Sequence, residues 1–202
     1  MQNISAQQID ILNEIGNIGA GNAATALSQL MGTMVDMSLP WTKLCLIEEG
    51  CELLSRPDEA GVGIQIALEG KINGLTLLTF DEESALYILN AFGDMLPDKR
   101  LESDMARSAL MEVGNIVTGS FATAISEFLK TTAWCTPPLL IHDYFDAFVC
   151  SVVVSGCQET DHVLVFKTEL FVGGKALQSD LAFMPTKESF QLIMRELDAT
   201  RG

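Results

Sequence analysis

Two glutamate–asparagine pairs are the residues of this chain whose types and spacing suggest chemistry. Glu14 stands three residues before Asn17, and Glu112 stands three residues before Asn115, so each pair shares one face of a helix. A carboxylate pairs with cations, and a carboxamide both donates and accepts hydrogen bonds. The sequence contains no nucleophile elbow, Walker loop or zinc-protease motif. The two pairs are therefore the candidate catalytic residues.

An internal repeat places each pair at the same point of a long helix. Residues 12–31 align without gaps with residues 110–129 at an offset of 98, and ten of the twenty positions are identical. Such self-similarity indicates duplication of a structural unit. We therefore expect one domain made of two repeats, about 1–97 and 98–202, which join within residues 93–100.

The helix periodicity separates an apolar face from a polar face. At 100° per residue the first copy has an apolar stripe that we expect to be buried, formed by Ile11, Leu12, Ile15, Ile18 and Leu30. The polar stripe recurs in both copies, as Asp10, Glu14, Asn17 and Gly21 and then as Ser108, Glu112, Asn115 and Gly119. A glycine inside a helix costs about 1 kcal/mol relative to alanine. We expect such glycines to permit close approach, by a neighbouring helix or, on the polar stripe, by a partner protein.

The remainder of each copy predicts a hairpin followed by a helix. The expected strands are 62–68, 75–80, 163–172 and 181–184, and the expected shorter helices are 81–92 and 187–197. Residues 148–155 also read as a strand, with a possible short helix before them. We predict an α+β fold: an internally duplicated pseudo-two-fold domain with an antiparallel sheet of paired hairpins, two long motif helices and smaller helices.

Composition limits the classes of partner. Lys and Arg total 12 against 27 Asp and Glu, for a formal net charge of -15, so we expect neither nucleic acid nor an anionic membrane surface to bind. No apolar run reaches the roughly 20 residues of a membrane span, and the polar N-terminus does not read as a signal peptide, so we expect a cytoplasmic protein. The five cysteines and two histidines have no metal-ligand spacing. We therefore expect buried thiols, and neither a metal nor a cofactor of its own.

A glycine-rich stretch offers one alternative. Residues 19–24 fit the relaxed dinucleotide pattern G-x-G-x-x-A. That pattern requires a preceding strand and a tight turn, with the phosphates at the start of the helix. Here it lies in the middle of the predicted helix, which argues against nucleotide binding.

The pairs belong to a longer pattern that resembles a known family. Asp10 and Ser108 stand four residues before the glutamates, and Pro40 and Pro138 follow the asparagines after 22 intervening residues. This pattern is similar to that of the CheC, CheX and FliY family of phosphatases, which act on the phosphorylated chemotaxis regulator CheY. The likeness covers essentially the whole chain. Two intact motifs favour the CheC branch over CheX, and we expect no added FliY-type domain because the last predicted helix lies close to Gly202.

The resemblance implies an aspartyl-phosphate phosphatase whose substrate is a CheY-like receiver domain. The receiver would supply its own magnesium ion and lysine. Asn17 and Asn115 would orient the hydrolytic water, and Glu14 and Glu112 would pair with the receiver lysine. The aspartate, serine and two prolines of the longer pattern would support the motif without taking part in catalysis. The resemblance also implies a second partner, the receptor deamidase CheD.

Two other functions remain possible at this point. One is a non-catalytic chemotaxis adaptor that binds CheD or phosphorylated CheY. The other is a purely structural duplicated domain, for which both polar stripes would be dispensable. Retention of both Glu–Asn pairs favours the phosphatase.

Overall fold

Each half of the protein begins with a long, capped helix. The computed structural model describes residues 4–157 and 160–200, and the long helices are α1 (Ala6–Met31) and α4 (Asp104–Phe128). The Ser5 side chain accepts a hydrogen bond from the Gln8 backbone, and the Gln8 side chain accepts one from the Ser5 backbone, so the two residues form a capping box. Ser103 caps α4 in a similar way by accepting from the Ala106 backbone.

Seven antiparallel strands form one sheet with two equivalent halves. The strands are β1 (Val35–Leu46), β2 (Ala60–Gly70), β3 (Gly74–Asp81), β4 (Ala133–Cys135), β5 (Leu139–Tyr144), β6 (His162–Val172) and β7 (Lys175–Pro185). Their order is β1-β6-β7-β3-β2-β4, and β5 also pairs with β2. Hairpin β2–β3 joins hairpin β6–β7 through β3 and β7 at the centre. The predicted sheet of paired hairpins and its pseudo-two-fold symmetry are confirmed.

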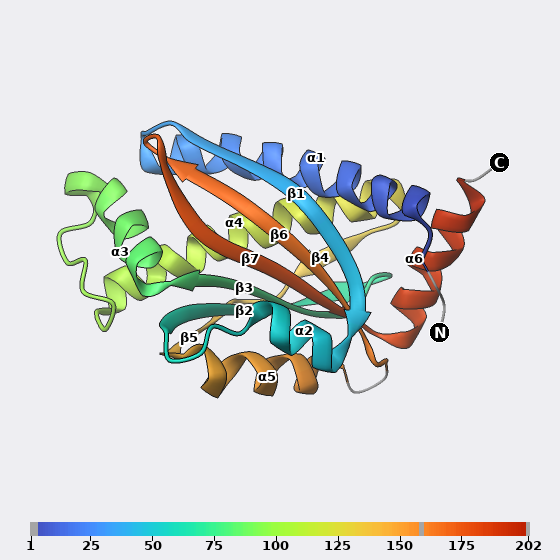
Figure 1. Cartoon of the computed structure of the whole chain (residues 1–202). Coiled ribbons are helices and arrows are strands. Elements are labelled where there is room, and N and C mark those ends of the chain that lie inside the picture. Colours follow the sequence, from blue (N-terminus) through green and yellow to red (C-terminus); the bar gives the residue numbers. More distant parts are fainter. Residues whose placement is uncertain (1–3, 158–159, 201–202) are drawn as a thin grey trace.

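Helices cover both faces of this sheet. The shorter helices are α2 (Ile47–Leu54), α3 (Glu82–Ala91), η1 (Gly93–Met95), α5 (Phe145–Gly156) and α6 (Lys187–Ala199). Figure 1 shows α1 and α4 over one face and α2 and α5 under the other. The larger apolar core lies under α1 and α4, and a second, smaller core lies between the sheet and the α2–α5 pair. The two motif helices therefore present their outer surfaces on one side of the protein.

The predicted strand at residues 148–155 is wrong, because this segment belongs to helix α5. The run of valines at 152–154 has a high strand propensity, and tertiary packing overrides it. Phe145, Phe148, Val149, Val152 and Val153 are buried at helical spacing against the second face of the sheet. Helix α5 is the repeat equivalent of α2, since α2 begins at residue 47 and α5 begins one offset of 98 later, at residue 145.

The expected apolar stripe of α1 is wrong at one position. Leu12 and Ile15 are buried and Ile11 and Leu30 are partly buried, but the side chain of Ile18 is 50% exposed. Small residues fill the buried face instead, among them Gly16, Gly19, Ala20, Ala23 and Ala24. The predicted stripe, based on the large apolar side chains alone, is therefore rotated away from the buried face of α1. The cause is that α1 packs against α4 as well as against the sheet.

Two further features bear on the sequence predictions. Strands β1, β4 and β5 and helix α2 lie in segments where the sequence indicated only a connection. The join between the repeats near residue 97 stays a prediction.

No helix in the described part of the chain is both long and apolar enough to cross a membrane.

Candidate active site

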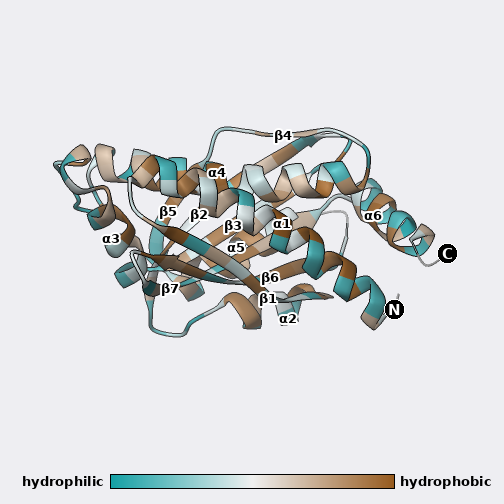
Figure 2. Cartoon of the chain, turned by 90° about the horizontal axis from the view of Figure 1, so that it is seen from above, coloured by the Kyte–Doolittle hydropathy of each residue, from teal (hydrophilic) through white to brown (hydrophobic). Residues whose placement is uncertain are grey.

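The two motif helices pack side by side (Figure 2), and the sequence colours of Figure 1 show that they run in opposite directions. Gly19 of α1 makes the close approach: a Cβ at this position would lie 3.0 Å from the Cα of Phe121 in α4. Residues near the start of α1 therefore meet residues near the end of α4, and the converse holds at the other end. Each motif is consequently flanked by the second half of the opposite helix.

Both motif carboxylates are free on the outer surface. Asp10, Glu14 and Glu112 are exposed, as the predicted polar stripe requires. Neither Glu14 nor Glu112 forms an ion pair or hydrogen bond with another residue that the structure describes. Ser108 is exposed as well. Because nothing in the described chain neutralises them, the two glutamates are available to a cationic group of another molecule.

The surface around the motifs is acidic. Helix α1 contains two acidic residues and no basic residue, while α4 contains three acidic residues and one arginine. That arginine, Arg107, is engaged within the protein, where its guanidinium donates to the backbone carbonyl of Leu140 at 3.1 Å. A face of this charge attracts a basic surface and raises the rate at which a basic partner associates.

The two asparagines differ in their contacts. The Asn17 amide nitrogen donates to the carbonyl oxygens of Asn13 at 2.9 Å and Leu39 at 3.2 Å, and its oxygen accepts from the Leu39 N–H at 3.0 Å. Asn115 is half-buried and forms no hydrogen bond with another described residue. The duplicated motif therefore has two different geometries.

The motif prolines lie at opposite edges of the sheet. Pro40 is exposed within β1, where the pairing with β6 is irregular between Ser38 and Trp41. Pro138 is half-buried in the gap between β4 and β5. Pro40 thus coincides with an interruption of the β1 pairing, and Pro138 precedes β5, because a proline cannot donate to a strand ladder.

Surface hollows next to the motifs combine residues of both long helices. A hollow of about 290 Å³ contains Glu14 and Ile18 of α1 together with Glu127 and Phe128 of α4. Sequence reasoning missed Glu127, although an antiparallel pairing of the two predicted helices would have placed it there. The partly apolar lining beside two carboxylates suits the methylene stem and charged head of a lysine.

A second hollow lies beside the other motif. It measures about 350 Å³, and its lining includes Asn22 of α1 and Asn115, Gly119 and Ser120 of α4. Asn115 therefore lines this hollow together with other polar side chains of both helices. Asn22 and Ser120 occupy equivalent positions in the repeat, and sequence reasoning missed both.

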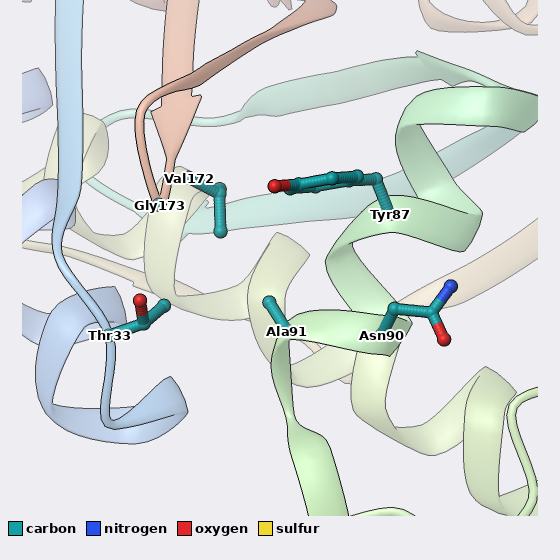
Figure 3. A pocket seen from close by; sticks show the side chains of 6 residues that line it. All are labelled: Thr33, Tyr87, Asn90, Ala91, Val172 and Gly173. Carbon is teal, nitrogen blue, oxygen red and sulfur yellow. The ribbon is translucent and has the colours of Figure 1, made fainter.

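A third hollow, of about 220 Å³, lies between α3 and the turn of hairpin β6–β7. Figure 3 shows the Tyr87 ring pointing toward Val172 across it. None of its six lining residues belongs to a motif or carries a charge. It therefore takes no part in the candidate active site.

The glycines of the motif helices fall into two groups. A Cβ added at Gly16 would lie 2.9 Å from a methyl carbon of Leu39, and one at Gly114 would lie 2.5 Å from a methyl carbon of Ile64. These two glycines serve internal packing. A Cβ at Gly21 or Gly119 would meet nothing within 4 Å, so no contact within the described protein requires glycine there.

This contrast predicts opposite effects on stability. Gly21→Ala and Gly119→Ala should each raise the free energy of unfolding by about 0.4–1 kcal/mol, because alanine restricts the unfolded chain and meets no neighbour. Gly114→Ala is the matched control, and overpacking against Ile64 should lower stability by about 1–3 kcal/mol. Urea unfolding followed by circular dichroism measures both. A destabilised Gly119→Ala would show that this glycine has an internal packing role.

The cysteines and histidines serve packing and local pairing. Burial raises the pKa of the Cys45 and Cys157 thiols to about 11 and that of Cys51 to about 12, so all three stay protonated at neutral pH and are poor nucleophiles. His142 pairs with Glu82 at 3.3 Å, and His162 stacks on Phe190. Within the described ranges no group of three or more His, Cys, Asp or Glu residues could hold a metal ion.

Comparison with solved structures defines the class of protein. Thermotoga maritima FliY superposes with a TM-score of 0.76 at 22% identity, covering 96% of this chain and 98% of that chain. A chain of the CheX–CheY–BeF3–Mg2+ complex from Borrelia burgdorferi superposes with a TM-score of 0.50 at 18% identity, covering 84% and 96%. The fold is therefore that of FliY and CheX proteins.

Sequence comparison identifies the family. The model of the CheC-like family matches residues 8–42 and 105–142, which contain both Glu–Asn pairs and both prolines. The CheY-P phosphatase CheC of Bacillus subtilis (strain 168) is 30% identical over 202 residues, which cover 98% of this chain and 97% of that protein. This chain belongs to the CheC-like family.

Proposed function

We propose that this protein is a phosphatase that hydrolyses the phosphoaspartate of a CheY-like receiver domain. The observation that carries the proposal is the pair of unneutralised glutamates, each one helical turn from an asparagine, on an acidic surface. The related Bacillus subtilis protein is named a CheY-P phosphatase, which supports the same substrate.

The receiver supplies most of the chemistry. A receiver domain holds its phosphoaspartate beside its own magnesium ion and lysine and needs a well-placed attacking water. Phosphoryl transfer depends mainly on positioning and electrostatics, and a carboxamide that orients water is an established device. The structurally similar complex with CheY contains BeF3 and Mg2+, which supports a magnesium ion on the receiver.

Each motif residue has a separate role in this mechanism. Glu14 or Glu112 pairs with the receiver lysine and docks the helix, because a carboxylate aimed at the phosphoryl group would repel it. The oxygen of the Asn17 or Asn115 amide accepts a hydrogen bond from the attacking water, and its nitrogen donates one to a phosphoryl oxygen. The water attacks phosphorus, the bond between phosphorus and the aspartate oxygen breaks, and the receiver regains its carboxylate. No phosphorylated intermediate forms on this protein.

Gly21 and Gly119 extend the docking surface. They lie on the same stripe as the motifs, and their open surroundings leave room for the backbone of the receiver. The alanine variants described above are stable probes of this contact. They should therefore weaken receiver binding while the fold becomes more stable.

A turnover experiment separates the enzyme from an adaptor. With magnesium present, protein at one-twentieth of the receiver concentration should release phosphate from many receivers per protein molecule. An adaptor that binds phosphorylated CheY would at most change the lifetime of a stoichiometric complex. We also propose that CheD is a second partner, so one arm of the experiment should contain CheD. Phosphate release no faster than from the receiver alone, with or without CheD, would favour the adaptor.

A further inference from the structure

The two copies differ in the backbone segment that faces each motif asparagine. At Asn17 this segment is Leu39. Its N–H donates to the Asn17 amide oxygen, and its carbonyl oxygen accepts from the Asn17 amide nitrogen. The pairing between β1 and β6 is irregular between Ser38 and Trp41, and Leu39 has no paired residue in β6. Its backbone N–H and carbonyl are therefore available to α1. The following residue, Pro40, has no N–H to compete for the same acceptor.

The second copy cannot form the same contact. The repeat offset of 98 places Pro137 at the position of Leu39, and proline has no N–H to donate. The chain here is tied to β2 instead, where the Thr136 backbone donates to Ala67 and the Thr136 hydroxyl accepts from Ala67. Asn115 accordingly has no hydrogen bond to another described residue.

The contacts of Asn17 conflict with the role proposed for it. A carboxamide has two donor hydrogens, and at Asn17 both are directed to the carbonyl oxygens of Asn13 and Leu39. The amide oxygen retains one lone pair. In this conformation Asn17 can accept from water but cannot donate to a phosphoryl oxygen, whereas Asn115 can do both.

We infer that the backbone N–H and carbonyl of Leu39 position Asn17 away from catalysis, and that Pro137 leaves Asn115 available, so the second copy supplies most of the turnover. The inference rests on the proposed function. The first copy retains a free Glu14 and the hollow shared with Glu127, so it still docks a receiver. Its asparagine must leave Leu39 before it can act.

Hydrogen exchange tests the contact without reference to activity. Loss of one hydrogen bond should speed exchange of the Leu39 amide by about two- to tenfold in Asn17→Ala. Asn17→Asp retains an acceptor for that amide and should keep it protected. Asn115→Ala is the matched control and should leave Leu39 exchange unchanged. Equal exchange at Leu39 in the wild type and Asn17→Ala would overturn the inference.

Single-site activities test the consequence. Asn115→Ala should lose at least about tenfold more activity than Asn17→Ala, because Asn17 must break hydrogen bonds before it acts. Pro137→Leu, made in the Asn17→Ala background, supplies an N–H beside Asn115 and should lower the remaining activity several-fold. Pro137 is exposed, so the fold should tolerate this change. Pro57→Leu, at an exposed site outside both motifs, is its control.

The outcomes separate this inference from the proposed function. Equal losses in the two alanine variants, or a Pro137→Leu protein as active as its parent, would overturn the unequal roles while leaving the phosphatase intact. Complete absence of phosphatase activity would overturn the proposed function and with it the unequal turnover. The exchange experiment would then still decide whether Leu39 holds Asn17.

Discussion

Replacing both motif asparagines, Asn17→Ala with Asn115→Ala, is expected to lower the rate of receiver dephosphorylation by about 10²–10³. This is the typical effect of removing one oriented polar group that acts on a transition state. Receiver binding should persist, because Glu14 and Glu112 remain exposed for docking. Single-turnover decay of phosphorylated receiver at saturating protein gives the rate, and titration gives the affinity.

A matched asparagine controls for loss of a helical amide. Asn90 is exposed in α3, and its nitrogen donates to the carbonyl oxygen four residues earlier, as that of Asn17 does. Asn90→Ala should leave the rate unchanged. A folded Asn17→Ala, Asn115→Ala protein with full activity would assign both asparagines to helix structure and leave the water without an orienting group.

The second large effect concerns docking. Glu14→Lys combined with Glu112→Lys should remove detectable receiver binding while circular dichroism stays unchanged. A hydrogen bond to a charged group contributes about 1.5–3 kcal/mol, so its loss weakens each site by about 10–10². The introduced lysine adds repulsion of the receiver lysine. The fold should survive, since both positions are exposed and neither glutamate has a partner among the described residues.

Net charge must be controlled in this experiment. Glu52→Lys with Glu59→Lys makes the same change in total charge at two exposed positions, in α2 and just before β2, away from the α1–α4 surface. This protein should bind the receiver nearly as well as the wild type. If the motif variant retains its affinity, docking uses another surface; if both variants lose it equally, binding depends on total charge.

The features that local sequence encodes were predictable. The 98-residue offset placed both motif helices, and the shorter helices expected at residues 81–92 and 187–197 are confirmed as α3 and α6. Glycine-containing turns and alternating apolar runs located both hairpins, with the β7 strand longer than predicted. Exposure of both glutamates followed from periodicity, because acids remain in water unless they are paired, whereas the half-burial of Asn115 did not.

The features that depend on packing were not predictable from local pattern. Residues 152–154 have strand-forming side chains, but a helix at this segment buries its apolar side chains against the second face of the sheet and α2. The exposure of Ile18 depends on where α4 crosses α1, which small residues such as Gly19 determine. Helix periodicity alone does not specify that crossing.

At the candidate site, too, the features set by local sequence were predictable and those set by packing were not. The sequence identified the Glu–Asn pairs, their spacing and their exposed face. It did not identify the hollows shared between α1 and α4, or the contact between Asn17 and Leu39, because each joins residues that are distant in the chain. Once the contact is known, the alignment of Leu39 with Pro137 explains why only one copy has it.

The fate of labelled phosphate tests the central claim most directly. A CheY-like receiver carrying ³²P on its aspartate is mixed with this protein and magnesium, and label is followed on the receiver, on this protein and as inorganic phosphate. The account predicts that label passes from receiver to inorganic phosphate at a rate that rises with protein concentration, and that none appears on this protein. An unchanged receiver lifetime at every protein concentration, or label on this chain, would contradict it.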